Sequence, residues 1–254
     1  MTINHEVVGD GPAVLLVHAG VADARMWAPQ VEDLRRDHRV ITVDLRGYGE
    51  TPLPAGSAYS DAGDLLELLD ALAGEGVVDD GPVAVVGASY GGNVVLQAVS
   101  KAPERFRRVV LLAPPVDGVE PTEDLRAFWG EENALLDQDD VDGATALNVR
   151  TWIGPEADDA AKNLLFTMQK RAFELQLAAG DVDNEEYEVV PANLTMPVKL
   201  YVGAHDLEFF RTGARHLAGQ LPDAELTELP WAGHLPTMER PAEGVKLVRE
   251  ALTS

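Results

Sequence analysis

Residues 83–92 limit what this chain can fold into more than any other stretch. Residues 83–86 are apolar and mostly β-branched, which is typical of a buried strand, and residues 93–98 open a helical pattern. Residues 87–91 between them fit the G-x-S-x-G pattern, which holds its serine on a sharp strand-to-helix turn. Glycines flank Ser89 because neighbouring backbones pass too close to that turn for a side chain. The pattern predicts a nucleophilic Ser89, although an ordinary glycine-rich turn would also fit the pentapeptide alone.

Polar residues follow three further predicted strands. The stretches and the residues to which they lead are 13–17 before His18, 198–202 before Asp206, and 226–231 before His234. Together with Ser89, they give the chain order serine, aspartate, histidine, with each residue at or just past the carboxyl end of a predicted strand. A hydroxyl, a carboxylate and an imidazole that meet at one edge of a sheet are the groups that nucleophilic acyl transfer uses.

These residues give the chain a resemblance to the α/β-hydrolase superfamily, in its serine esterase or lactonase branch. The elbow at Ser89 and the order of Asp206 and His234 carry it, together with residues 44–49, DLRGYG, which are similar to the D-x-R-G-x-G loop of that family. The resemblance covers nearly the whole chain, and it is specific for the fold but not for the substrate. It implies an α/β fold in which helices flank a mostly parallel central sheet and a small helical cap is inserted.

Strands alternate with helical stretches along most of the chain, as in a parallel sheet with helices on both faces. The expected elements are an antiparallel edge strand at residues 2–8, core strands at 39–43 and 109–112, and a leucine-rich helix capped by Ser60. The strand rhythm stops between about residues 117 and 190. We therefore expect a core domain of residues 1–116 and 191–254 and a helical cap of residues 117–190.

The resemblance assigns a role to each of three residues. Ser89 would attack the substrate carbonyl, His234 would take the serine proton, and Asp206 would hold the imidazole in the right tautomer. Histidine suits the role of general base because its ordinary pKa lies near the working pH. Asp117, just past the preceding strand, is an alternative acid, since some relatives carry the acid there.

Two backbone N–H groups are expected to form an oxyanion hole. By the family pattern they belong to Tyr90, which follows the nucleophile, and to Gly20, in the loop after residues 13–17. The chain has Ala19 where the family usually has glycine, and this departure matters because alanine resists a positive φ. His18 is interpreted as a residue that orients the loop and not as a second base.

The expected cap is acidic and carries aromatic residues at helical spacings. Most of them fit the cap's own small core, since aromatic side chains bury most of their area in such packing. A minority should line an apolar pocket, for which Trp129 and Trp152 in the cap are candidates. Trp27, after the oxyanion loop, would fit the pocket wall and burial beneath the loop equally well. Because the cap is short, we expect a small pocket and a small substrate.

The composition narrows the partners. The 254 residues carry a formal net charge of −23, which disfavours nucleic acid and anionic membranes. This acidity fits either adaptation to salt or the drift of a genome's composition. With 0 cysteines, no glycine-rich phosphate loop and no zinc-spaced cluster, no cofactor and no metal are expected. Without an apolar span or a signal peptide at the start, we expect a cytoplasmic monomer or homodimer.

The leading hypothesis is a cofactor-free serine hydrolase that acts on a small ester, lactone or similar activated carbonyl through an acyl-enzyme. A C–C bond hydrolase of meta-cleavage products and a perhydrolase would use the same three residues. The C–C hydrolase would need a cationic or polar group for a substrate carboxylate, and Arg126, Arg150 and Arg171 are candidates. A non-catalytic ligand receptor on the same fold is the alternative from another functional class.

Overall fold

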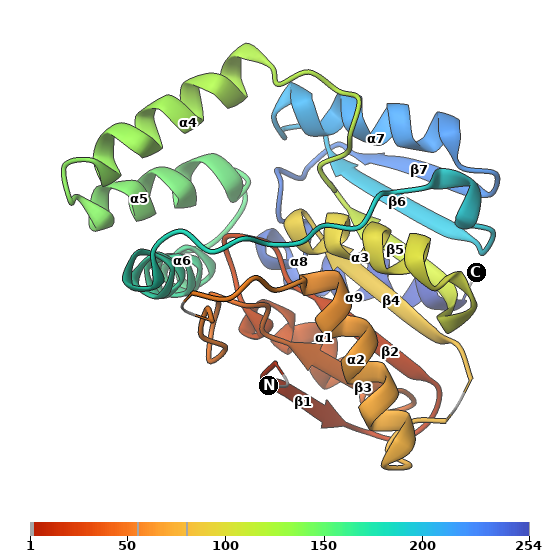
Figure 1. Ribbon diagram of the computed structural model, residues 1–254. Helices are drawn as coiled ribbons and strands as arrows, with labels where there is room; N and C mark the ends of the chain where they lie inside the picture. Colours follow the sequence, from red (N-terminus) through yellow and green to blue (C-terminus); the bar gives the residue numbers. More distant parts are fainter. Residues whose placement is uncertain (1–2, 55, 80, 254) are drawn as a thin grey trace.

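The computed structural model describes residues 3–54, 56–79 and 81–253, and a seven-stranded sheet lies at its centre (Figure 1). The strands are β1 (His5–Val8), β2 (Ala13–Val17), β3 (Arg39–Val43), β4 (Val83–Ala88), β5 (Phe106–Leu112), β6 (Val198–Gly203) and β7 (Ala224–Leu229). Their order in the sheet is β1-β3-β2-β4-β5-β6-β7. β1 runs antiparallel to β3, and the other neighbours are parallel. The expected α/β-hydrolase sheet is confirmed; residue 2 of the expected edge strand lies outside the described residues.

Helices cover both faces of the sheet (Figure 1). They are α1 (Ala28–Leu34), α2 (Asp61–Gly74), α3 (Tyr90–Lys101), α7 (Glu208–Gln220), α8 (Pro236–Glu239) and α9 (Pro241–Thr253), with short 3-10 turns η1 (Ala24–Trp27), η2 (Pro103–Arg105) and η3 (Pro191–Asn193). Along β2, Val14 and Leu16 join the core beside α1 and α9, whereas Leu15 and Val17 join the core beside α2 and α3. A strand buried on both faces needs apolar residues at successive positions, which explains its unbroken apolar run.

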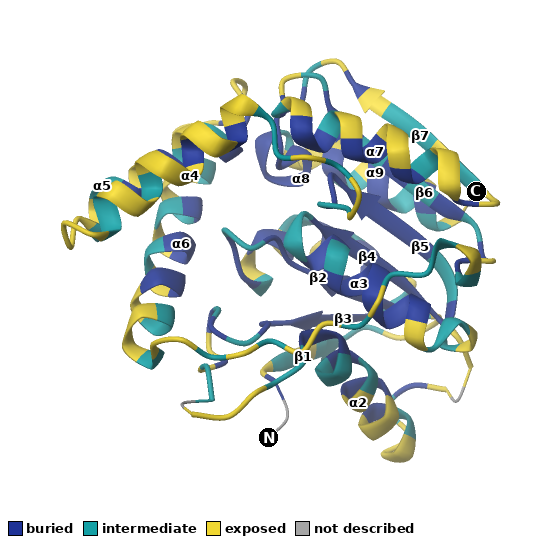
Figure 2. Cartoon of the chain, turned by 45° about the horizontal axis from the view of Figure 1, so that its top comes forward, coloured by how far each residue is buried: buried dark blue, intermediate teal, exposed yellow. Residues whose placement is uncertain are grey.

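Three further helices lie between β5 and β6, and we call them the insertion helices. They are α4 (Glu123–Leu136), α5 (Val141–Trp152) and α6 (Asp159–Ala179). They stand to one side of the sheet and the helices that cover it (Figure 1). Figure 2 shows exposed residues along the outer faces of α4 and α5. In the described part of the chain, no helix is both long and apolar enough to cross a membrane.

The ends of the strands and helices follow local chemistry. Ser60 caps α2 as expected, because its hydroxyl accepts the N–H of Gly63 at 3.2 Å. β4 continues past its β-branched run to Ala88. The expected strand at residues 226–231 is shifted, since β7 ends at Leu229, where Pro230 has no N–H to donate to a ladder.

Candidate active site

Ser89 lies on the turn between β4 and α3, at the carboxyl edge of the sheet. Its backbone has φ 48° and ψ −122°, a strained conformation for a residue with a side chain. The turn packs tightly on β2, because a Cβ atom added to Gly91 would lie 2.2 Å from the carbonyl oxygen of His18. Ser89 is only partly buried, so its hydroxyl is open to other groups.

His234 connects Ser89 to Asp206. Its Nε2 lies 2.7 Å from Ser89 Oγ, and its Nδ1 lies 2.7 Å from Asp206 Oδ2. A carboxylate only accepts, so Nδ1 carries the proton and Nε2 accepts from the hydroxyl. The other oxygen of Asp206 accepts the N–H of Leu207 at 2.7 Å. The side chains of His234 and Asp206 are 2% and 1% exposed, so water does not compete for their bond.

Aromatic side chains surround the imidazole. The ring of Phe210, from α7, has its centroid 4.2 Å from that of His234, and the ring of Trp152, at the end of α5, lies 4.9 Å away. Phe128, from α4, lies edge-on to Trp152 at 4.7 Å. Trp152 Nε1 donates to Asn148 at 2.9 Å, which fixes the orientation of the indole. The insertion helices and α7 thus build an apolar wall beside His234.

Three other residues singled out in the sequence lie away from this hydrogen-bonded chain. Asp117 is exposed, and Asp206 is the acid that is bonded to His234. Trp27 is fully buried, and its Nε1 has no hydrogen-bond partner among the residues that the structure describes. Trp129 is 43% exposed and makes no aromatic ring contact within residues 3–54, 56–79 and 81–253. Of the three tryptophans expected at the pocket, the structure brings Trp152 to His234.

Gly20 and Tyr90, the expected oxyanion donors, lie side by side. A Cβ atom added to Gly20 would lie 3.1 Å from the Cβ of Tyr90. Among the described residues, no acceptor takes up the backbone N–H of either one, so both are available to a ligand. Ala19 does not need a positive φ: in the described chain the non-glycine residues with that conformation are Ser89, Ala113 and Asp139. Alanine at position 19 therefore strains the loop no more than glycine would.

His18 fixes the loop that carries Gly20. Its Nε2 accepts the N–H of Leu45 at 2.9 Å, and its Nδ1 donates to the carbonyl of Ala19 at 2.8 Å. The bond that Nε2 accepts requires the neutral ring, and burial lowers the pKa of His18. The interpretation of His18 as a structural residue fits this geometry.

The side chain of Tyr90 belongs to a buried polar network. Its hydroxyl donates to Asp61 Oδ2 at 2.6 Å and accepts from Asn184 Nδ2 at 2.8 Å. Burial raises the pKa of Asp61 to about 6, although the bond from Tyr90 acts in the opposite direction. Asn184 lies between α6 and β6, so this network ties that segment to the start of α3.

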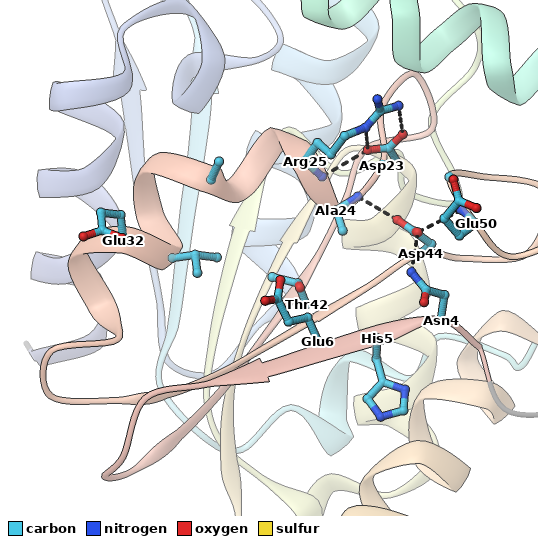
Figure 3. Close-up of a pocket in the computed structure, with 13 residues that line it drawn as sticks. Asn4, His5, Glu6, Asp23, Ala24, Arg25, Glu32, Thr42, Asp44 and Glu50 are labelled. Atoms are coloured by element: carbon cyan, nitrogen blue, oxygen red, sulfur yellow. Dashed lines mark hydrogen bonds and ion pairs between the residues drawn. The ribbon is translucent and has the colours of Figure 1, made fainter.

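A cavity of about 440 Å³ lies apart from these residues, among β1, β3, η1 and α1 (Figure 3). Charged and apolar residues both line it, and Asp44 has a structural role there. The carboxylate of Asp44 accepts N–H groups from Asn4, Ala24 and Glu50 at 2.8–3.0 Å, so it joins the loop after β2 to the loop after β3. No group of side chains in the described residues is arranged to hold a metal ion.

Sequence reasoning missed Phe210, Asp61 and Glu239. Phe209 and Phe210 follow closely on Asp206, and an aromatic pair beside a candidate acid is a signal that could have been used. Asp61 gives no such signal, because its partners are distant in the chain. Glu239 is a charged residue in an otherwise apolar stretch after His234, which is the pattern of a buried carboxylate.

Comparisons with known proteins identify the family of this chain. The sequence model described as "Alpha/beta hydrolase family" matches residues 14–247. Pimeloyl-[acyl-carrier protein] methyl ester esterase of Chromobacterium violaceum is 28% identical over 266 residues, which cover 99% of this chain and 98% of that protein. 2-Hydroxy-6-oxo-2,4-heptadienoate hydrolase of Pseudomonas putida is 37% identical over 134 residues, so the match spans 50% of this chain and 46% of that protein.

A solved structure is also similar over nearly its full length. A thermophilic esterase from Thermogutta terrifontis, with malate bound, superposes with a TM-score of 0.81 at 26% identity, covering 99% of this chain and 93% of that one. The family match over residues 14–247 shows that this chain belongs to the alpha/beta hydrolase family.

Proposed function

We propose that this protein is a serine hydrolase that cleaves a small ester or lactone through an acyl-enzyme. One observation carries the proposal: Ser89, His234 and Asp206 form a continuous chain of hydrogen bonds of 2.7 Å each, an arrangement in which His234 can take the serine proton. The esterase names of the relatives from Chromobacterium and Thermogutta support the same class of reaction.

The reaction would proceed in two halves. Ser89 Oγ attacks the carbonyl carbon while its proton passes to His234 Nε2, and the N–H groups of Gly20 and Tyr90 hold the oxyanion. When the intermediate collapses, the alcohol leaves with the proton from His234, and the acyl group stays on Ser89. Water then attacks the acyl-enzyme and gives a proton to His234. As this second intermediate collapses, the acid is released and His234 returns the proton to Ser89 Oγ. Asp206 stabilises the imidazolium in both halves.

The insertion helices are proposed to act as the cap of this site, with residues 117–190 as the cap and residues 1–116 and 191–254 as the core. The contact of Trp152 with His234 supports this division, because Trp152 is at the end of α5 and its ring lies 4.9 Å from the imidazole. Phe128 and Phe210 add further apolar surface to the same wall, so a compact apolar substrate fits it best.

The C–C bond hydrolase is the weaker candidate, in spite of the half-length match to the Pseudomonas protein. Its substrate carboxylate would need a cation that faces the pocket. Arg126 and Arg171 are exposed, and Arg150 is exposed and paired with Glu131. A neutral ester or lactone needs no such group, which favours the esterase reaction.

Activity-based labelling tests the proposal. A fluorophosphonate should label the wild-type protein once per chain, and Ser89→Ala should abolish both labelling and hydrolysis. Ser57→Ala, at an exposed serine outside the site, is the matched control and should keep both. The wild-type protein should hydrolyse p-nitrophenyl acetate and butyrate much faster than palmitate. Labelling that persists in Ser89→Ala, or a preference for palmitate, would contradict the proposal, and a folded protein without any acyl hydrolysis would indicate a receptor.

A further inference from the structure

Glu239, at the end of α8, is a buried acid that takes no part in the proposed reaction. The residue is 3% exposed. Its Oε2 accepts the N–H of Gly233 at 2.7 Å, and its Oε1 accepts the N–H of Glu156 at 3.0 Å. Within the described residues these two backbone groups are its polar partners. Burying a charge is costly, so these two donors are what holds the carboxylate in place.

The two donors belong to chain segments next to His234 and Trp152, whose rings are in contact at the site. Gly233 directly precedes His234, whereas Glu156 lies in the link between α5 and α6, shortly after Trp152. The ring centroids of His234 and Trp152 lie 4.9 Å apart. The carboxylate of Glu239 therefore joins the backbone next to His234 to the link that follows Trp152.

Close backbone packing confines the carboxylate at this junction. A Cβ atom added to Gly154 would lie 1.8 Å from Glu239 Oε2, and a Cβ atom added to Gly233 would lie 2.6 Å from Gly154 Cα. There is no space for even a methyl group between the link, the histidine loop and the carboxylate. An added group on the link, on the histidine loop or on Glu239 must therefore displace the other two.

We infer that Glu239 is a positioning residue, which clamps the histidine loop to the α5–α6 link and so keeps His234 Nε2 on Ser89 Oγ. This inference rests on the proposed role of His234 as the base. A base that shifts by about 1 Å can cost about 100-fold in rate even when the substrate still binds, so the clamp acts on kcat more than on KM.

Two variants disturb the clamp by different means. In Glu239→Gln the amide keeps one acceptor oxygen but turns its NH₂ group toward the second N–H, which breaks one of the two bonds. In Gly154→Ala the carboxylate is intact, but the new methyl group displaces it. Glu156→Gln is the matched control, because it removes the exposed ion pair of Glu156 with Arg240 and leaves the Glu156 N–H in place.

With p-nitrophenyl butyrate, Glu239→Gln and Gly154→Ala should each lower kcat by at least about 10-fold and change KM by less than about threefold, whereas the control keeps both constants. Hydrogen exchange should quicken at the amides of Gly233 and Glu156 in both variants and elsewhere stay as in the wild type. A kcat within about twofold of the wild type in either folded variant overturns the inference. So does unchanged exchange at the two amides, which is decisive even if the wild-type protein hydrolyses no ester and the proposed function itself fails.

Discussion

Asp206 sets the direction of each hydrogen bond that leads to Ser89. Because its carboxylate can only accept, His234 must present a bare Nε2 to the serine hydroxyl. The same logic governs His18, whose two backbone partners leave it one tautomer. At the scale of single residues, the chemistry of the site therefore depends on which atoms carry protons. Isosteric substitutions change these proton positions with little change in side-chain shape.

Asp206→Asn tests this control. The amide would donate toward His234 Nδ1, so the ring proton would move to Nε2 and the serine proton could not be accepted. We expect kcat for p-nitrophenyl butyrate to fall by about 10³- to 10⁴-fold, as in other serine triads, with unchanged thermal unfolding. Asp117→Asn, at the exposed alternative acid, is the control. If Asp117→Asn impairs kcat and Asp206→Asn does not, the acid has been misassigned.

The stability of the folded protein should depend on pH through Asp61. Burial raises its pKa in the folded protein to about 6 from the ordinary 3.8. The folded state therefore binds this proton more tightly than the unfolded chain does, and the stability that it contributes at low pH is lost as pH rises through about 6. The side chains of Tyr90 and Asn184 contact the carboxyl, and the backbone N–H of Arg46 donates to it at 3.3 Å. Asp64, which is paired with the Arg46 side chain, lies nearby.

Urea unfolding of the wild-type protein and Asp61→Asn would measure this contribution. Between pH 4 and pH 7 the wild-type free energy of unfolding should fall by about 2 kcal/mol relative to the variant, which cannot titrate at this position. Asp79→Asn, at an exposed aspartate, should show no such difference. A wild-type advantage that grows with pH would mean that the folded state prefers the carboxylate.

At the scale of elements, the strands were predicted far better than the contacts of the insertion helices. β2 and β3 have the bounds that the sequence indicated, because runs that are mostly aliphatic or β-branched are typical of strands covered on both faces. The periodicity of α4 and α5 shows which face is apolar, but it does not show what that face packs against. Trp129 and Trp152 therefore looked equivalent in the sequence, whereas only Trp152 reaches His234. The extent of the cap stays a prediction.

The same pair of tryptophans tests the proposed cap. Trp152→Leu keeps an apolar side chain but removes the ring beside His234 and the bond to Asn148. We expect kcat/KM for p-nitrophenyl butyrate to fall by about 10-fold, because the wall no longer fits a compact acyl group. Trp129→Leu, at an exposed position on α4, should leave kcat/KM within about twofold of the wild type. Equal losses in both variants would indicate a general weakening of the insertion helices.

At the scale of the whole molecule, the net charge of −23 acts on anything that approaches the site. We expect KM for an anionic nitrophenyl ester, such as a hemisuccinate, to fall several-fold from low to high salt, while KM for neutral p-nitrophenyl butyrate stays unchanged. The reason is that the screening length shrinks from about 30 Å at about 0.01 M salt to about 3 Å at about 1 M. If KM for the anionic ester did not change with salt concentration, a local cationic site would be indicated instead.

The distance between Ser89 and His234 along the chain also matters while the protein is being made. The two residues are separated by 145 positions, and Asp206 comes late as well. On a ribosome, Ser89 leaves the exit tunnel long before His234, so under the proposed mechanism a nascent chain would display the serine without its base. A product of interrupted translation that stops before residue 234 would then lack the proposed activity. Hydrolysis would therefore report on chains that extend past residue 234.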